Sequence, residues 1–456
     1  MGGVDVTFSS GTRIHVVGVG GAGMSGLARL LAMRGCVVSG SDDRDSPVLD
    51  ELRAVGVAVT VGHDRGNGAD AEVVLWSPAV AEDHVELVAA RDRGAQLVAR
   101  SLALAELARI RSVVGLTGTH GKTTATSMMV QVFHAEGVDA SRLLGAPVIG
   151  VGANGHWGDQ PLVMEVDESY GTFGLLVPGT LGLLNVEADH LDYYGTRESL
   201  EAAFAALADR TTGPVVVWSD DPGNRRVTSR VARPVITVGR SHADWRVSHE
   251  SVSRRAARFR LSSDEQELEI TLGVTGSHNI ANAAVVAVLA LTGGVSSAAV
   301  IAGLRAFRGA PRRFEFRGRW RGADVYEDYA HLPGEVAATL SATRAAGYER
   351  ITAVFQPHRV TRTLALASEF GPAFAAANEV IVTDIYRAGE PNPTGATGEL
   401  VAKAVAGAHD GMVRYAATFD EVVTALDQGH RVDAILFLGA GDVASVVGML
   451  SGGLDP

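Results

Sequence analysis

The stretch VVGLTGTHGKTT at residues 113–124 governs the interpretation of the whole sequence. Its apolar start leads into glycines, a lysine and two threonines, and a helix-compatible segment follows at 125–135. This order predicts a strand, a tight loop and the start of a helix. In such a loop, backbone N–H groups can point at an anion that also lies at the positive end of the helix. The N–H groups in question belong to Gly118, Thr119, His120 and Gly121.

The side chains of this loop have the chemistry that a nucleoside triphosphate needs. Lys122 is placed to reach the outer phosphates, and the Thr123 hydroxyl, followed by Thr124, is placed to hold Mg²⁺. The strict Walker pattern requires a glycine five positions before Gly121, where this sequence has Leu116. We therefore predict a phosphate-binding loop that departs from the form found in motors and switches. The alternative is an ordinary glycine-rich turn with a solvated lysine.

Composition limits what such a loop can serve. A chain of 456 residues predicts two to four domains, with three favoured at about 150 residues each. The formal net charge of −12 argues against a nucleic-acid partner, which requires clustered cations. The single cysteine, Cys36, excludes an intramolecular disulfide and fits a reducing compartment. The first residues show no export signal, and no apolar run approaches the length of a membrane span, so we expect a cytoplasmic protein.

The first domain carries a glycine fingerprint between a strand at 14–19 and an amphipathic helix. Gly18, Gly20 and Gly23 satisfy G-x-G-x-x-G, and the next strand, at 36–41, is followed by Asp42. This pattern predicts that a diphosphate attached to a nucleoside binds here, without specifying nicotinamide. A glycine-rich turn that binds no ligand is the alternative.

Two further short strands, at 57–61 and 73–76, continue a doubly wound sheet. His63 and Ser77 follow them, at the carboxyl ends where open α/β sheets bind ligands. A solvated loop histidine is an equally good interpretation of His63. A helix-like segment at 102–110 closes this domain near residue 110.

Carboxylates follow two strands of the second domain. The strand at 161–166 leads into acids at 165, 167 and 168, and the strand at 181–186 leads into EADHLDYYG. Downstream of a phosphate-binding loop, acids at strand ends suit Mg²⁺ and ATP, because the metal prefers oxygen ligands. The candidates are Glu165, Asp167, Glu168, Glu187, Asp189 and His190.

The end of the second domain and the whole third domain are predicted more coarsely. Residues 244–272 suggest antiparallel hairpins, and a helix beginning near Ser277 carries Asn279 and Asn282 on one face, to cap the helix or to bind an adenine edge. RGAPRRFEFRG at 308–318 is interpreted as a linker. Four strands at 324–329, 351–355, 379–383 and 434–439 alternate with helices in a third α/β unit, where His358, Arg359 and Arg362 form a positive corner suited to a carboxylate or phosphate.

These motifs together resemble the Mur ligases, the ATP-dependent family that attaches amino acids to UDP-muramic acid in peptidoglycan synthesis. The resemblance covers nearly the whole chain and is strongest to the branch that adds L-alanine to UDP-N-acetylmuramate. It implies an N-terminal Rossmann-like domain at 1–110 for the UDP-sugar, a central P-loop-type ATPase domain with a mainly parallel sheet at 111–311, and a C-terminal Rossmann-like domain at 312–456 for the amino acid. The motifs, in the family's order, are GVGGAGMSGLA, GTHGKTT, EVDES, NVEADHLD, GSHNIANA, RRFEFRG, DYAHLPGE and FQPHRVTRT.

The resemblance also implies roles for individual residues. UDP-sugar binding is implied for Gly20, Gly21, Gly23, Met24, Asp42, His63 and Ser77. ATP binding is implied for residues 118–124, and adenosine binding for Asn279, Asn282, Arg313 and Asp328. Mg²⁺ ligation is implied for Thr123, Glu165 and His190. Amino-acid binding is implied for Tyr329, His331, His358, Arg359 and Arg362, and the catalytic set for Lys122, Glu165, His190, His331 and Arg359.

The chain departs from the family pattern at Tyr170, Leu332 and Gly334, where an aspartate, a second histidine and a threonine are usual. The expected reaction passes through an acyl phosphate, and separate substrate domains imply closure before chemistry. Three alternatives stay open at this point. They are an NAD-dependent oxidoreductase, a non-enzymatic P-loop switch or scaffold, and a relative that ligates a recycled peptide. The sequence does not decide between a monomer and a weak dimer.

Overall fold

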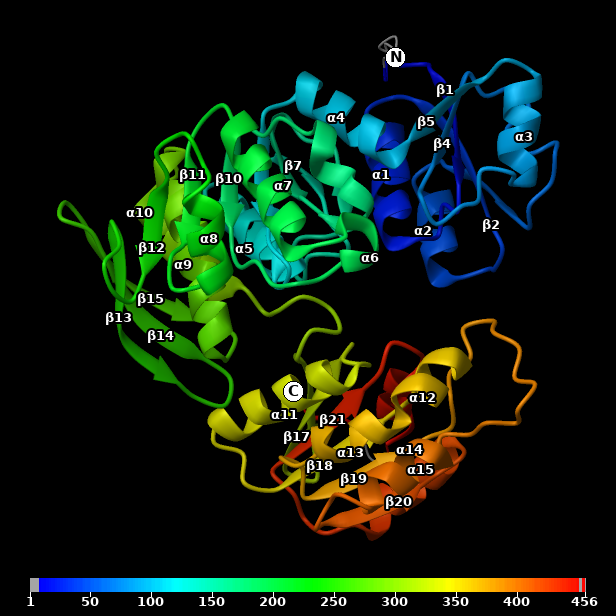
Figure 1. Cartoon of the computed structure of the whole chain (residues 1–456), viewed down its shortest axis with the longest axis vertical. Coiled ribbons are helices and arrows are strands. Elements are labelled where there is room, and N and C mark those ends of the chain that lie inside the picture. The colour runs from blue at the N-terminus through cyan, green and yellow to red at the C-terminus, as the bar shows by residue number, and fades with distance from the viewer. Residues whose placement is uncertain (1–7, 451–452, 456) are drawn as a thin grey trace. The chain divides into compact units, whose positions relative to one another are not determined.

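The computed structural model describes residues 8–450 and 453–455, apart from the side chain of residue 192. The described chain forms three sheets in succession along the sequence, of five, ten and six strands (Figure 1). The first two sheets belong to one compact unit, and the third belongs to a second unit together with residues 252–257 and 274–276. The first seven residues, on which part of the expectation of no export signal rests, lie outside the described residues.

The first sheet is parallel throughout, in the order β3-β2-β1-β4-β5. Successive connections leave β1 in opposite directions, so a crevice forms at the carboxyl ends of β1 and β4. Apolar residues of α1, α2 and α4 pack on one face and those of α3 on the other. The strands are β1 (Arg13–Val17), β2 (Val37–Asp42), β3 (Ala58–Val61), β4 (Val73–Trp76) and β5 (Gln96–Ala99). The helices are α1 (Ala22–Met33), α2 (Pro47–Ala54), α3 (Val85–Asp92) and α4 (Arg100–Ile110).

The second sheet has the order β15-β14-β13-β12-β11-β10-β6-β9-β7-β8. Its central strands are parallel because helices connect them, whereas β7 and β8 pair antiparallel. The strands are β6 (Val113–Thr117), β7 (Ala140–Leu143), β8 (Gly155–His156), β9 (Gln160–Glu165), β10 (Thr180–Leu183), β11 (Val215–Trp218), β12 (Ile236–Gly239), β13 (Trp245–Val252), β14 (Ala257–Ser262) and β15 (Glu267–Leu272).

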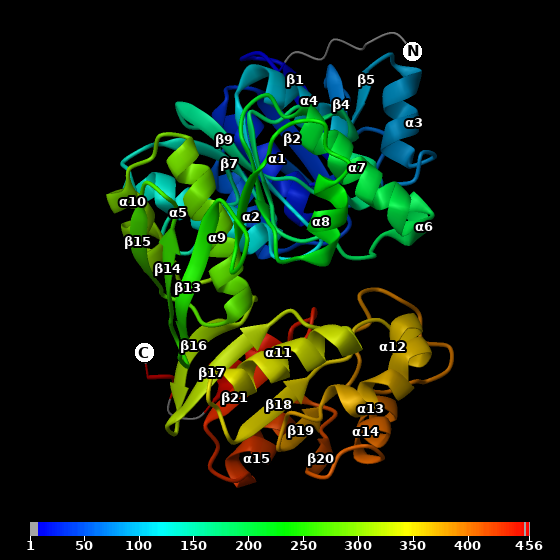
Figure 2. The same cartoon turned by 60° about the vertical axis from the view of Figure 1, so that its left-hand side comes forward.

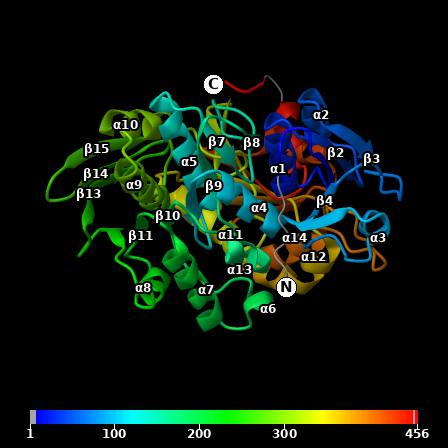
Figure 3. The same cartoon turned by 90° about the horizontal axis from the view of Figure 1, so that it is seen from above.

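Helices cover both faces of this sheet. Figure 3 shows α5, α9 and α10 on one side and α7 and α8 on the other. A Cβ on Gly182 of β10 would contact Val285 and Leu289 of α9, so a glycine there lets the helix approach closely. The helices are α5 (Lys122–Ala135), η1 (Ser169–Leu175), α6 (Leu191–Tyr194), α7 (Arg197–Arg210), α8 (Pro222–Thr228), α9 (Ser277–Thr292) and α10 (Ser297–Ala306).

The first and second sheets are joined by a close contact between α1 and β8. A Cβ on Gly155 would collide with the backbone of Gly26, so only glycine permits this approach. The Asn154 side chain donates to Ala22 O at 3.0 Å and to Ser25 Oγ at 3.2 Å. The two domains are therefore held together by packing and by hydrogen bonds.

The third sheet has the order β16-β17-β21-β18-β19-β20, with β16 antiparallel and the others parallel. Helices α11, α13 and α14 pack on one face, and α15 and η3 on the other. Figure 2 shows this domain with α11, α13, α14 and α15 around the sheet. The strands are β16 (Glu315–Trp320), β17 (Ala323–Asp328), β18 (Ile351–Phe355), β19 (Glu379–Val382), β20 (Met412–Tyr415) and β21 (Ala434–Leu438). The helices are α11 (Pro333–Ala345), α12 (Val360–Leu366), η2 (Ala367–Glu369), α13 (Phe370–Ala373), α14 (Glu399–Ala406), α15 (Phe419–Gln428) and η3 (Val443–Met449).

The three-domain α/β prediction is confirmed, with a mainly parallel central sheet. The linker predicted at 308–318 is wrong in its second half, which enters β16 and pairs with β17. Strands β13, β14 and β15 are hydrogen-bonded neighbours joined by connections too short for a parallel crossover, which fits the expected hairpins. Within the described residues, no helix has the length and apolar character to cross a membrane.

Candidate active site

The loop between β6 and α5 is shaped by two glycines with positive φ. Gly121 immediately precedes α5 with φ 82°, and Gly118 has φ 144°. A Cβ on Gly118 would lie 2.9 Å from Asn185 O, so the loop passes directly against the segment after β10. Glycine is therefore required by both conformation and space at this position.

Asn185 already uses two of the four N–H groups that the sequence predicted would face an anion. Its backbone oxygen accepts from Thr119 N at 3.0 Å, and its Oδ1 accepts from His120 N at 2.7 Å. For the N–H groups of Gly118 and Gly121, no described residue supplies an acceptor. In this conformation the loop therefore offers an anion fewer N–H groups than predicted, because Asn185 braces its first half.

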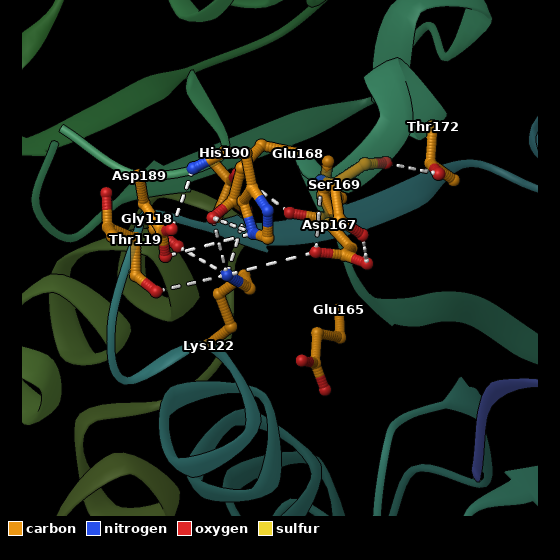
Figure 4. A network of polar contacts seen from close by, with 12 residues as sticks. Gly118, Thr119, Lys122, Glu165, Asp167, Glu168, Ser169, Thr172, Asp189 and His190 are labelled. Atoms are coloured by element: carbon orange, nitrogen blue, oxygen red, sulfur yellow. Dashed lines mark hydrogen bonds and ion pairs between the residues drawn. The ribbon is translucent and has the colours of Figure 1, made fainter. Parts of the chain in front are cut away.

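Lys122 is the centre of a polar network (Figure 4). Its Nζ donates to Gly118 O at 2.8 Å, to Thr119 O at 3.2 Å and to the two carboxylate oxygens of Glu168 at 3.0 and 2.8 Å. Asp167 lies 4.0 Å away. Glu168 is 1% exposed, and burial raises its pKa while the Lys122 charge partly offsets that rise. The lysine is thus held by a buried carboxylate at the start of the helix.

A second carboxylate, Glu165, lies outside this network (Figure 4) and beside Thr123 according to its hydrogen bond. Its Oε2 accepts from Thr123 Oγ1 at 3.0 Å and from Gly145 N at 3.0 Å. A hydroxyl and a carboxylate at this separation can both ligate one ion with a preference for oxygen ligands. The residues present therefore fit Mg²⁺.

The third predicted metal ligand, His190, is placed next to different acids. It has φ 52°, and its Nε2 lies 4.0 Å from Glu168 Oε1 and 3.8 Å from Asp189 Oδ2. Within the described chain, His190 forms no ion pair with Glu165. His190 therefore lies beside the Lys122–Glu168 pair in this structure.

The two asparagines predicted for adenosine differ in their surroundings. Asn282 is 6% exposed, and a Cβ on Gly121 would lie 2.9 Å from its amide atoms. Asn282 therefore packs against the phosphate-binding loop itself. Asn279, one turn earlier in α9, is half-buried.

The glycine loop after β1 contacts one carboxylate side chain and one guanidinium side chain. Gly20 N donates to Asp42 Oδ2 at 2.9 Å, so Asp42 holds the loop. A Cβ on Gly23 would lie 2.6 Å from Cζ of Arg100, the first residue of α4. Among the described residues, no carboxylate forms an ion pair with Arg100. The sequence prediction missed this guanidinium, which lies where a diphosphate is expected.

The other residues predicted for the UDP-sugar lie at the same edge of the first sheet. Met24 is buried in α1, and Ser77, just after β4, accepts a hydrogen bond from Val80 N at 2.9 Å through its carbonyl oxygen. His63 Nδ1 lies 3.0 Å from Glu86 Oε1, a carboxylate that is 1% exposed. His63 is therefore fixed in place by a buried acid and is not a solvated loop histidine.

Aromatic and imidazole rings form a row in the third domain. The ring centroids are 5.3 Å apart for Tyr329 and His331, 5.6 Å for His331 and His358, and 5.7 Å for His358 and Tyr386. Burial, together with the nearby His331 and arginines 362 and 359, lowers the pKa of His358 to about 4. His358 is therefore neutral near pH 7 and can accept from Arg362 Nη1 at 3.2 Å.

The remaining predicted residues of this domain are divided between exposed and structural positions. Arg359, with φ 69° and a half-exposed side chain, lies 3.9 Å from Glu390. Arg313 lies over the Tyr329 ring at 5.3 Å. Asp328 is buried, and its oxygens accept from the N–H groups of Phe314 and Ala330 at 2.7 and 2.8 Å. Its carboxylate thus stabilises the end of β17 in the present arrangement.

Comparison with models of known protein families identifies the family of this chain. The Mur ligase family, catalytic domain, matches residues 13–112; the Mur ligase middle domain matches 116–290; and the Mur ligase, glutamate ligase domain, matches 312–441. The chain belongs to the Mur ligase family.

Individual Mur ligases are similar along the whole length. The UDP-N-acetylmuramate–L-alanine ligase of Nitratidesulfovibrio vulgaris is 38% identical, over 95% of this chain and 97% of that protein. The protein of the same name from Thermobifida fusca is 41% identical, over 95% of each. The crystal structure of a UDP-N-acetylmuramate-alanine ligase from Thermotoga maritima superposes with a TM-score of 0.82 at 28% identity, covering 95% of this chain and 97% of that one.

The three positions at which we expect this Mur ligase to depart from the family pattern lie outside the Lys122 network. Tyr170 has φ 52° and is exposed. Leu332 precedes α11, where its N–H and that of His331 donate to Glu335 Oε2 at 3.1 and 2.9 Å. A Cβ on Gly334 would meet no atom within 4 Å. The glutamate, not the leucine, therefore caps this helix.

Proposed function

We propose that the chain is an ATP-dependent amide ligase that joins L-alanine to the lactyl carboxylate of UDP-N-acetylmuramate through an acyl phosphate, releasing ADP and phosphate. One observation carries the proposal: a glycine loop places Lys122 and the Thr123–Glu165 pair together at the carboxyl end of β6. The names of the relatives supply the substrates.

Charge explains why such a site is needed. A carboxylate resists attack by an amine because oxide is a very poor leaving group, and transfer of a phosphoryl group to it makes phosphate the leaving group. Two anions must meet in that step. Lys122 is positioned to reduce their repulsion, provided that it exchanges Glu168 and the two loop carbonyls for phosphate oxygens. Rotation of the flexible lysine side chain would let Nζ move from Glu168 to the phosphate oxygens.

Mg²⁺ would be held by Thr123 and Glu165, with His190 joining when the ATP is bound. Bound Mg²⁺ would neutralise phosphate charge and orient the transferred phosphoryl group. Gly145 N keeps Glu165 Oε2 directed at Thr123 before any ion arrives. Asn282 would bind the nucleotide next to the loop, and Asn279, Arg313 and Asp328 would contact the adenosine.

The sugar nucleotide would bind at the glycine loop of the first domain. Its diphosphate would face the backbone of Gly20, Gly21 and Gly23 and the start of α1. Arg100 would supply a local positive charge for the diphosphate. Such a charge is needed because the protein's net charge of −12 repels anionic substrates. Met24, Asp42, His63 and Ser77 would surround the nucleoside end.

The amino acid would bind in the third domain. Arg359 and Arg362 would bind its carboxylate, and neutral His358 would accept a hydrogen bond from Arg362. The Tyr329 ring would line one side of the site. His331 would orient the amine or take its proton, since its ring lies between those of Tyr329 and His358. Such a product serves peptidoglycan precursor synthesis in the cytoplasm.

A product assay tests the proposal. Purified protein is incubated with ATP, Mg²⁺, UDP-N-acetylmuramate and each single amino acid, or a cell-wall tripeptide with a free amino terminus, and the products are weighed by mass spectrometry. A mass gain of one alanine, with phosphate release that requires both acceptor and amino acid, is expected. Ligation of the tripeptide instead would select the recycling alternative, and NADH binding without ligation would select the oxidoreductase.

A further inference from the structure

The first domain contains a cluster of metal-ligating side chains, of which the proposed reaction uses only His63, beside the nucleoside. His63, His84 and Glu86 each bring one ligand atom within 4.8 Å of the others. The two imidazole rings are in contact, edge to face, with centroids 4.4 Å apart and planes at 87°. Glu86 is 1% exposed, whereas both histidines are partly open to solvent. An ion arriving from solvent could therefore reach both rings and one carboxylate oxygen.

We propose that His63, His84 and Glu86 form a site for a zinc-class transition-metal ion. Two imidazoles and one carboxylate with an open fourth position form a ligand set that Zn²⁺ uses in proteins, whereas Mg²⁺ prefers oxygen ligands alone. The site is distinct from the Thr123–Glu165 pair, which offers only oxygen ligands in the central domain.

The surroundings of the cluster support ligation. Metal-bound histidines usually donate their other ring nitrogen to a carboxylate, and His63 Nε2 lies 3.4 Å from Asp43 Oδ1. Ligating carboxylates are themselves hydrogen-bonded, and Glu86 Oε2 accepts from Ser41 Oγ at 2.6 Å and lies 3.3 Å from His15 Nε2. Glu86 Oε2 is thus fixed, and Oε1 lies 3.0 Å from His63 Nδ1 and accepts from Asn67 Nδ2 at 2.6 Å.

Two of the three ligand atoms already have the spacing that a zinc site requires. Zn²⁺ ligands lie about 2 Å from the ion, so tetrahedral ligand atoms are about 3.3 Å apart. His63 Nδ1 and Glu86 Oε1 are already 3.0 Å apart. If its Nδ1 were the ligand atom, His84 would give up its hydrogen bond from Glu86 N, which is long at 3.3 Å and therefore weak.

The charge of Glu86 also suits a cation. Burial alone would raise its pKa, but hydrogen bonds from His15, Ser41, Asn67 and His63 outweigh burial and lower the pKa to about 2.

The metal would also oppose sugar-nucleotide binding. His63 follows β3, at the same sheet edge as Asp42, where the nucleoside end is proposed to bind. Ligation would hold the His63 ring at Glu86 more firmly than the present 3.0 Å hydrogen bond does, so that the ring could not turn toward a nucleoside. This coupling, unlike the metal site itself, rests on the proposed function.

Equilibrium dialysis of the metal-free full chain against Zn²⁺ with excess Mg²⁺ tests the site. We expect one tightly bound equivalent that His84→Asn weakens at least about tenfold. His134→Asn, a change at an exposed histidine of α5, is the matched control and should keep that equivalent. His190→Asn should also keep it, which separates the site from the acids of the central domain. Co²⁺ bound in place of Zn²⁺ should give tetrahedral absorption bands that His84→Asn removes.

Two results would overturn the metal site. One is no Zn²⁺ binding to the wild-type chain in excess Mg²⁺, and the other is equal binding by wild type and a folded His84→Asn variant. UDP-N-acetylmuramate affinity is measured separately, and Zn²⁺ should lower it in wild type but not in His84→Asn. Failure of the metal-free chain to bind UDP-N-acetylmuramate would refute the proposed function and leave the metal result intact.

Discussion

Replacing Lys122 with alanine is expected to destabilise the central domain as well as to abolish the use of ATP. The reason is that Glu168 is 1% exposed and Lys122 Nζ contacts both of its oxygens, at 3.0 and 2.8 Å. Removing one partner of a buried pair leaves the other charge without compensation. His190 Nε2, at 4.0 Å, is too distant to replace the lysine fully.

The magnitude has a ceiling, because an orphaned Glu168 can take up a proton. The ordinary pKa of this carboxyl is 4.5, and each pH unit is worth about 1.4 kcal/mol, so holding it protonated near pH 7 costs about 3 kcal/mol. Near pH 5 the same step costs less than about 1 kcal/mol. In the variant the folded pKa of Glu168 lies above the unfolded one, so the variant loses stability as pH rises.

Urea unfolding at the two pH values measures this effect. Tryptophan fluorescence is suitable because four of the five tryptophans lie in the unit that contains the second sheet, and hydrogen exchange in β6 and β9 gives a local readout. The double variant Lys122→Ala with Glu168→Gln is the matched control and should recover most of the loss near pH 7. A loss below about 1 kcal/mol near pH 7, or one that does not change with pH, would refute the reasoning.

Four other changes give separate checks. Gly23→Ala places a Cβ 2.6 Å from Arg100 Cζ and should weaken UDP-N-acetylmuramate binding about tenfold in calorimetry, with little change in melting temperature because the guanidinium can shift; an unchanged affinity would remove this loop from the site. Thr123→Ala should raise the Mg²⁺ concentration needed for half-maximal ligation, and an unaltered Mg²⁺ dependence would count against its role as a ligand. Glu86→Gln should destabilise the chain by about 3 kcal/mol near pH 7, because the pKa of Glu86 is about 2 against 4.5, and the difference from wild type should vanish as pH falls from 4.5 to 2 in acid-unfolding curves. His358→Gln should leave the pH dependence of ligation unshifted between about pH 6 and pH 8, since the pKa of His358 is about 4; a displaced acid limb would contradict this.

The parts of the fold that follow from local pattern could be predicted from the sequence. The apolar runs at 73–76 and 351–355 are strands with those bounds, because short buried parallel strands have continuous apolar residues. The glycines before Lys122 predicted a tight loop and a helix start; α5 begins at Lys122 as predicted, and Gly121 in the loop has φ 82°. Strands β5, β7 and β20 were missed, since four-residue strands with mixed residues lack a distinctive period.

The site was less predictable where its contacts join distant parts of the chain. Lys122 and Glu168 are 46 residues apart, and His15 and Glu86 are 71 apart, so no local spacing indicates either pair. Arg100 sits at the start of an ordinary helix, and only the fold brings it against Gly23. Asn185 begins the motif NVEADHLD, but nothing in that motif indicated that its side chain and carbonyl oxygen would hydrogen-bond to the phosphate-binding loop. Residues of this kind are fixed by strand order, which sequence pattern leaves undetermined.

The central claim is that the acceptor's own carboxylate is phosphorylated before alanine attacks, and an isotope experiment tests it most directly. UDP-N-acetylmuramate carrying heavy oxygen in its lactyl carboxylate is incubated with the enzyme, ATP, Mg²⁺ and L-alanine, and the released phosphate is analysed by mass spectrometry. One heavy oxygen should appear in each phosphate, because the acyl phosphate leaves with an oxygen of the carboxylate. Amide product accompanied by unlabelled phosphate would contradict the account.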